Sequence, residues 1–136
     1  MGFELREHTA DVAVAADAET LGGVFAALGD GLAAAMCDSV PEGGERFDLR
    51  ETAESREAAL FDYLDRLIYE RDVRAVLPVD NEASVREAEG EWIVTASARG
   101  VSLDRVTARD VKAVTYSEMA LDATADGWEA YVVFDV

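Results

Sequence analysis

The residues best suited to chemistry lie at the two ends of the chain. Near the start, His8 and Asp11 stand three residues apart in the stretch HTADV, and His8 is the sole histidine of the sequence. At the other end, the side chain of Asp135 and the terminal carboxylate of Val136 place two anions within one residue of each other. Two adjacent negative charges favour a nearby counter-ion.

If the terminal strand lies beside HTADV, Asp11 adds a third carboxylate to this pair. An all-oxygen set of this kind suits a hard cation such as calcium or magnesium, and it does not suit zinc. Two simpler interpretations stay open. A histidine three residues before an aspartate is also typical of a turn closed by hydrogen bonds, and a chain end is often frayed and solvated.

Lys112 is the one lysine among the 12 basic residues, and the others are all arginines. On the strand that we expect from residue 111, Lys112 shares a face with Val114 and Tyr116. A single lysine in a chain whose other basic residues are arginines is easier to explain by a specific functional role than by solubility. We therefore regard Lys112 as a candidate for a functional contact. The alternative is a salt-bridged strand residue.

Several other catalytic chemistries lack the residues that they need. The single cysteine, Cys37, excludes an internal disulfide and a cysteine-cluster metal site, and we interpret it as a small residue at the end of a helix. One histidine does not support a Ser-His-Asp triad, and the sequence contains no P-loop and no GxGxxG pattern.

Composition indicates one compact domain. The chain has 136 residues, half of them hydrophobic, which is enough to bury a proper core. No apolar run approaches the roughly 18 to 20 residues of a membrane span, and the start of the chain lacks the basic patch and apolar segment of a signal peptide. We therefore expect a cytoplasmic protein with no membrane association.

The acidity of the chain is its most unusual global property. The sequence has 29 acidic residues against 12 basic ones, a formal net charge of −17, and the acids are spread along its whole length. Together with the arginine bias, this suggests a cytoplasm of very high salt, as in a halophilic archaeon, because at about 1 M salt the Debye length falls to roughly 3 Å. The same charge argues against direct nucleic-acid binding, since no basic patch is available for phosphates.

Hydrophobic periodicity predicts two helices. From an N-cap at Thr20, apolar residues at helical spacing predict a helix that ends near Cys37. Four glycines inside it cost stability or mark a close approach to a strand. A second helix, capped by Ser55 or Thr52, is predicted by one apolar stripe of residues: Leu60, Tyr63, Leu64, Leu67 and Ile68.

Alternating patterns predict strands in the rest of the chain. We expect them at residues 3–6, 12–16, 46–50, 84–89, 92–98, from 111 onward and from 128 to the end, with a loop at 41–45 and a hairpin turn at residues 126–127. Pro78 and Asn81 break a stretch of uncertain structure, and residues 101–110 have no assignment. These elements indicate a single α+β domain over residues 1–136, with two helices packed on a mostly antiparallel sheet.

The sequence resembles the archease family at several motifs, which occur in the order typical of that family. They are HTADV at residues 8–12, the helix that follows it, YLDRLIYE at 63–70, KAVTY at 112–116 and the closing FDV. The resemblance spans nearly the whole chain. One departure is that Ser117 follows KAVTY where members commonly carry a histidine, so no role of that histidine carries over to Ser117.

The resemblance implies a non-catalytic activator of the GTP-dependent tRNA-splicing RNA ligase. Archeases promote guanylylation of this ligase and allow its multiple turnover, while the ligase itself performs the chemistry. The resemblance also implies a divalent metal ion, assigned in the family as calcium, bound by Asp11, Asp135 and Val136. His8, Lys112 and Tyr116 are then candidates for contact with the partner protein.

Two other functions stay open on the residues alone. One is a stand-alone metal-dependent phosphoester hydrolase that uses Asp11 and Asp135, although the sequence offers no clear general acid and no second metal cluster. The other is a chaperone-like binding module that needs no metal and presents a sheet face or its first helix to a partner.

Overall fold

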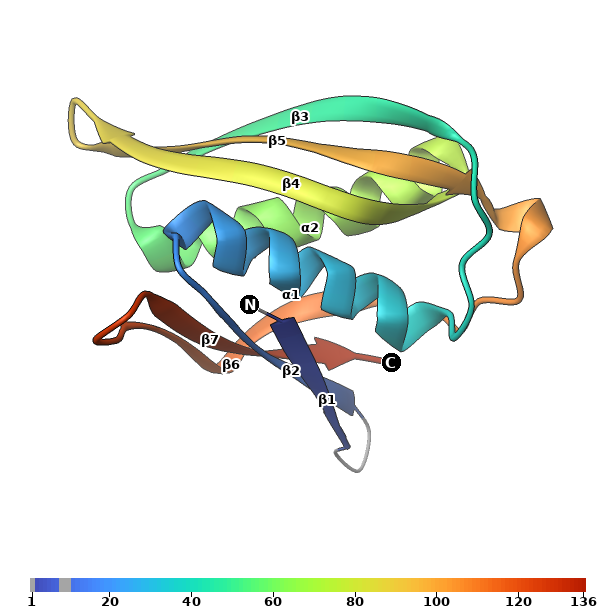
Figure 1. Ribbon diagram of the computed structural model, residues 1–136, viewed down its shortest axis with the longest axis horizontal. Helices are drawn as coiled ribbons and strands as arrows, with labels where there is room; N and C mark the ends of the chain where they lie inside the picture. The colour runs from blue at the N-terminus through green and yellow to red at the C-terminus, as the bar shows by residue number, and fades with distance from the viewer. Residues whose placement is uncertain (1, 8–10) are drawn as a thin grey trace.

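Two helices lie between two antiparallel sheets in the computed structural model, which describes residues 2–7 and 11–136 (Figure 1). The helices are α1 (Leu21–Met36) and α2 (Arg56–Arg74). The four-stranded sheet has the order β1 (Gly2–Glu7), β2 (Asp11–Ala18), β7 (Trp128–Asp135) and β6 (Ala113–Ala123). The three-stranded sheet has the order β3 (Glu45–Ala53), β5 (Glu91–Ser102) and β4 (Val76–Ala88).

The α+β class predicted from the sequence is confirmed, but the strands form two sheets and not one. The reason lies in α1, where only Gly23, Asp30 and Ala34 of its 16 residues are not buried. A helix that is apolar nearly all round needs cover on more than one side. The two sheets supply this cover.

The glycines of α1 let both sheets approach the helix closely. A Cβ atom at Gly22 would meet the backbone of Ala83 in β4, and one at Gly31 would meet the side chain of Val14 in β2. The hydroxyl of Thr20 caps the helix by accepting a hydrogen bond from the backbone N–H of Gly23 at 2.9 Å. The predicted cap and the predicted close approach are therefore both confirmed.

Helix α2 buries one stripe, as its periodicity predicts, and its N-cap is Ser55, whose hydroxyl accepts a hydrogen bond from the N–H of Ala58 at 3.1 Å. At this end of the helix, the guanidinium of Arg56 lies 5.8 Å from the ring centre of Trp92 and 5.0 Å from that of Trp128. These cation–π contacts link the helix to one strand of each sheet.

Strand β4 runs unbroken through the two residues that we expected to interrupt it. Pro78 is tolerated because β4 is an edge strand, where a missing N–H breaks no ladder. Asn81 follows Asp80, whose positive φ of 48° belongs to a bulge between Val79 and Glu82. The backbone N–H and the side-chain amide of Asn81 both donate to Oδ1 of Asp30 in α1, each at 2.9 Å, so the helix stabilises the bulge.

Part of the segment that the sequence left unassigned crosses one end of the molecule, and we call residues 106–112 the strap. Strand β5 extends to Ser102, a single 3₁₀ turn covers Leu103–Arg105, and residues 106–112 run without regular structure to β6. Strand β6 begins at Ala113, two residues later than predicted. Among the described residues, no helix is long and apolar enough to cross a membrane.

Candidate metal site

A pair of aspartates lies at one end of the four-stranded sheet. Asp11 is the first residue of β2 and Asp135 is the last of β7, and the register of the two antiparallel strands places them directly opposite each other. The Cβ atoms of such cross-strand partners are roughly 4.5–5.5 Å apart, and their side chains share one face of the sheet. The terminal strand thus lies beside Asp11 and Val12, the described part of the HTADV stretch, as the sequence argument requires.

The surroundings of this pair differ between its two members. Asp11 is half-buried, and its Oδ1 atom is buried without accepting a hydrogen bond from any described residue, although Asp11 makes other interactions. Asp135 is exposed, and so is Val136, the residue that follows it. Like charges placed directly opposite each other across two strands repel, and a cation between them offsets this cost.

The donor set fits a hard divalent cation with few protein ligands. In residues 2–7 and 11–136, no group of three or more His, Cys, Asp or Glu side chains is placed to hold a metal. Asp11 and Asp135 by themselves are therefore an incomplete set of side-chain ligands. A third protein ligand would come from the carboxylate of Val136 or from the main chain, and calcium accepts both kinds of oxygen.

Lys112 lies next to the aspartate pair, but not on the strand as predicted. It directly precedes Ala113, which pairs with Asp135, and its backbone N–H donates to the carbonyl oxygen of Asp135 at 2.8 Å. It therefore does not share a strand face with Val114, which is buried in the core. The side chain of Lys112 is exposed and forms no ion pair within the described part of the chain, which argues against the salt-bridged alternative.

Two arginines that the sequence reasoning missed hold the strap that ends at Lys112. The buried guanidinium of Arg71 in α2 donates to the carbonyl oxygen of Val111 at 2.6 Å. Arg109 donates from its backbone N–H to the carbonyl oxygen of Met36 at 2.6 Å and from Nε to that of Ala35 at 3.0 Å. The sequence contains a signal for Arg71, which follows Leu64 by seven residues and Leu67 by four and so belongs to the buried stripe of α2.

Tyr116 lies apart from the aspartate pair. Its ring stacks on Phe61 of α2 with the ring centres 4.2 Å apart, and 55% of the residue is exposed. Partial burial and the carboxylate of Asp62 raise the pKa of the Tyr116 phenol. Ser117 is exposed in the following irregular stretch, where the pairing of β6 with β7 shifts between Thr115 and Ala120. His8, the remaining candidate, lies outside the described residues.

Comparison with known sequences gives a consistent result over nearly the whole chain. Residues 3–136 match the profile of the archease protein family (MTH1598/TM1083). The protein archease of Methanosarcina acetivorans is 33% identical over an alignment covering 98% of this chain and 95% of the relative. That of Pyrococcus furiosus is 28% identical, with 98% of each chain covered.

Comparison with solved structures supports the same fold. The solution structure of protein 1598 of Methanobacterium thermoautotrophicum superposes with a TM-score of 0.87 at 27% identity and covers 99% of both chains. The crystal structure of a Thermotoga maritima protein, described as an archease and possible chaperone, gives a TM-score of 0.63 at 21% identity, with 98% of this chain and 96% of that chain covered. The second likeness bears on the fold alone.

Proposed function

Because this chain belongs to the archease family, we propose that it activates a GTP-dependent tRNA-splicing RNA ligase by promoting guanylylation of the ligase and its multiple turnover. The observation that carries this proposal is the cross-strand opposition of Asp11 and Asp135. In this proposal the protein is a non-catalytic, cytoplasmic cofactor, and the ligase performs the chemistry.

In this proposal one divalent cation, proposed as calcium, joins the start of β2 to the end of β7, the two central strands of the four-stranded sheet. Asp11, Asp135 and the carboxylate of Val136 would hold the ion, which supplies positive charge for anionic groups at the interface with the ligase. Asp11 and Asp135 come from paired strands, so the sheet preorganises both carboxylates before any partner binds.

Lys112 is proposed to contact the ligase from the edge of this site. Its ammonium group is exposed, and its backbone is anchored to Asp135 on one side and through Val111 to Arg71 on the other. An exposed ammonium group without an ion pair to a described residue is available for an acidic side chain or a phosphate of the partner.

The test compares three altered proteins in calcium titration calorimetry and in a guanylylation assay of the cognate ligase. Asp11→Asn, Asp135→Asn and a form extended beyond Val136 each remove one proposed ligand. Each should weaken calcium binding by about tenfold or more, since even a residue that merely supports a ligand contributes that much. Stimulation of the ligase should fall in parallel.

Asp48→Asn is the matched control, because Asp48 is an exposed strand carboxylate on the other sheet. It should leave calcium affinity and stimulation unchanged. Full stimulation by Asp11→Asn would refute the metal-centred proposal, and unchanged calcium affinity in the extended form would show that Val136 is not a ligand.

A second candidate function is a chaperone-like binding module that needs no metal. The description of the Thermotoga structure as a possible chaperone applies to that protein, and it is the reason to keep this alternative. Stimulation of the ligase that survives a chelator would support this function over the metal-centred one. The hydrolase alternative is tested with the same preparations, since it requires the purified protein alone to cleave phosphoesters.

A further inference from the structure

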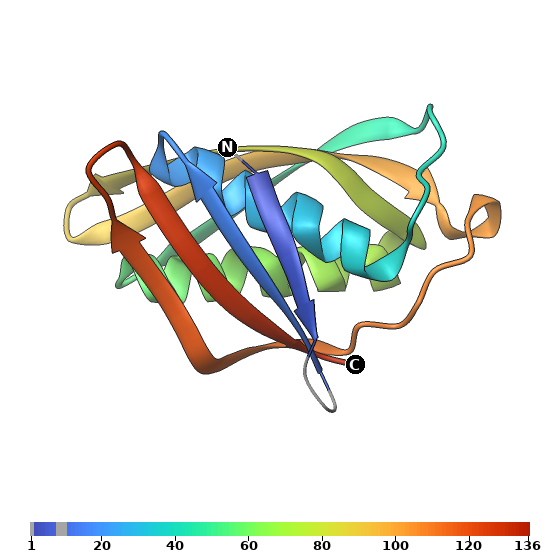
Figure 2. The same ribbon diagram turned by 60° about the horizontal axis from the view of Figure 1, so that its bottom comes forward.

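The outer face of the four-stranded sheet, turned away from the helices, carries a groove that the aspartate pair does not use. No described helix or strand is packed over this face (Figure 2), although Ala13 and Val133 on it are buried. The groove has a volume of about 530 Å³ and is lined by all four strands of the sheet. We call it the sheet groove and define it by the outward-facing residues that line it: Glu4, Ala15, Asp17, Ala120, Asp122, Glu129 and Tyr131.

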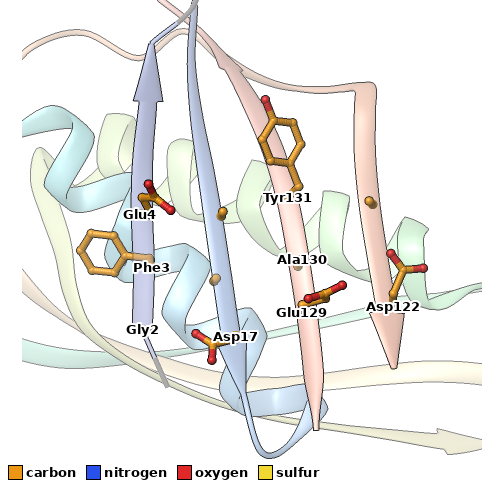
Figure 3. A pocket seen from close by; sticks show the side chains of 11 residues that line it. Gly2, Phe3, Glu4, Asp17, Asp122, Glu129, Ala130 and Tyr131 are labelled. Atoms are coloured by element: carbon orange, nitrogen blue, oxygen red, sulfur yellow. The ribbon is translucent and has the colours of Figure 1, made fainter. Parts of the chain in front are cut away.

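Three carboxylates form a row across the sheet groove. Glu129 of β7 pairs with Asp17 of β2 on one side and with Asp122 of β6 on the other, so the three side chains stand on adjacent strands at one level (Figure 3). None of the three forms an ion pair or a hydrogen bond through its side chain with another described residue. Like charges in directly opposed positions cost stability, so this row favours a positively charged partner.

The part of the sheet groove next to this row of carboxylates is lined by small apolar side chains. In the next row, Ala15 and Ala120 flank Tyr131, whose ring stands on the same face (Figure 3). Arginine and lysine side chains have an apolar stem and a cationic head, so their stems fit against the alanines while their heads reach the carboxylates. Arginine can also bind a carboxylate through two parallel hydrogen bonds.

The distribution of charge distinguishes this face from the rest of an acidic molecule. In the four-stranded sheet, β2, β6 and β7 contain no arginine and no lysine and β1 contains one arginine, Arg6, whereas β3, β4 and β5 all contain arginine. On the three-stranded sheet, the guanidinium of Arg99 lies 2.7 Å from the carboxylate of Asp80 and that of Arg46 lies 3.8 Å from Glu82. The carboxylates of Asp17, Asp122 and Glu129 are not balanced in this way within the described residues.

We propose that the sheet groove docks a segment of the partner protein that carries arginine or lysine side chains. The inference rests on the proposed function, in which that partner is the RNA ligase. The groove and the aspartate pair lie on one face, and Asp17 is six residues from Asp11 along β2, about 20 Å at roughly 3.3 Å per residue. A partner must therefore extend about 20 Å along this face to contact both the groove and the aspartate pair.

The test measures binding of the cognate ligase by biolayer interferometry to two charge-matched triple variants. The groove variant carries Asp17→Asn, Asp122→Asn and Glu129→Gln. The control variant carries Asp48→Asn, Glu87→Gln and Glu91→Gln, which removes the same charge from exposed positions on the other sheet. The groove variant should stay folded, because the three substitutions remove like charges that repel one another. Circular dichroism checks this.

The groove variant should bind the ligase about tenfold more weakly than the control variant, as expected when charge pairs worth about 1.4 kcal/mol in total are lost. Its affinity should also depend less on salt than that of the wild type. Equal weakening in both variants would show general charge attraction and would overturn the docking site. If the groove variant binds normally while the wild type still stimulates the ligase, the docking inference is wrong but the proposed function stands. If the wild type neither binds nor stimulates the ligase, the proposed function itself is refuted.

Discussion

Glu70 shows how two arginines control the ionisation of a buried carboxylate. The residue is 4% exposed, and its oxygens accept hydrogen bonds from Arg74 at 2.8 Å and from Arg66 at 3.3 Å. Arg66 also donates to Glu51 of β3 at 2.7 Å, so the group connects α2 with the three-stranded sheet. Burial alone would raise the pKa of Glu70, but the hydrogen bonds and charges of the two arginines outweigh it and lower the pKa below its ordinary value of 4.5.

Glu70→Gln should therefore lower the free energy of unfolding in a pH-dependent way. A carboxyl group whose pKa is lowered by folding stabilises the protein above its ordinary pKa and loses this effect as pH falls through the folded value. Urea unfolding should show a loss of roughly 1–2 kcal/mol near neutral pH that disappears in acid. Glu91→Gln, at an exposed position, serves as the control. A difference that stays constant across this pH range would contradict the assignment.

Among the elements, the strap of residues 106–112 has the closest connection to the site. Arg109 bonds the C-terminal carbonyl groups of α1 and also pairs with Asp38 at 2.9 Å, while Arg71 holds Val111 from α2. The ends of both helices therefore determine where Lys112 lies. Arginine side chains commonly bond the last carbonyls of a helix in this way.

Arg109→Ala should loosen the strap without unfolding the protein, since 55% of this side chain is exposed. We expect amide hydrogen exchange to become several-fold faster in the strap, and we expect ligase stimulation to fall while calcium affinity is kept. Arg105→Ala, in the 3₁₀ turn before the strap, is the control. Unchanged exchange in the strap, or a loss of calcium binding, would show that Arg109 does not act by positioning Lys112.

At the scale of the whole molecule, the net charge of −17 requires screening. The four-stranded sheet has three strands without a basic residue, so repulsion within it is not relieved by pairing inside those strands. The Debye length is about 30 Å at 0.01 M salt and about 3 Å at 1 M, so dilute buffer exposes each carboxylate to its neighbours. Adaptation to a high-salt cytoplasm stays a prediction.

Dialysis into dilute buffer should therefore reduce the folded structure, measured as a fall in thermal midpoint and in the circular dichroism of the helices. Salt added back can restore the structure either by screening charge or by favouring the folded state in general. Sucrose separates these two causes, because it favours the folded state without screening charge. Recovery with salt alone would support screening. A spectrum and a midpoint that do not change on dialysis would refute the prediction.

The sequence by itself determined the local elements of this protein. Side-chain periodicity and capping depend on residues only a few positions apart, so both helices and the cap at Thr20 were predicted correctly. For the second helix the sequence left Ser55 and Thr52 open, and the structure selects Ser55. The hairpin turn at residues 126–127 was predicted for the same reason, and the N–H of Thr124 closes it by donating to the carbonyl of Gly127 at 2.8 Å. The glycines of α1 indicated a close approach, but not which strands would approach.

Only the tertiary structure decided how these elements meet. Division of the strands between two sheets, the bulge of β4 against Asp30 and the strap that carries Lys112 all depend on contacts between residues far apart in the chain. The same is true of the candidate site. Asp11 and Asp135 were visible as carboxylates from the start, but the register of β2 against β7 is what makes them one pair, and a shift of one residue would turn them to opposite faces of the sheet.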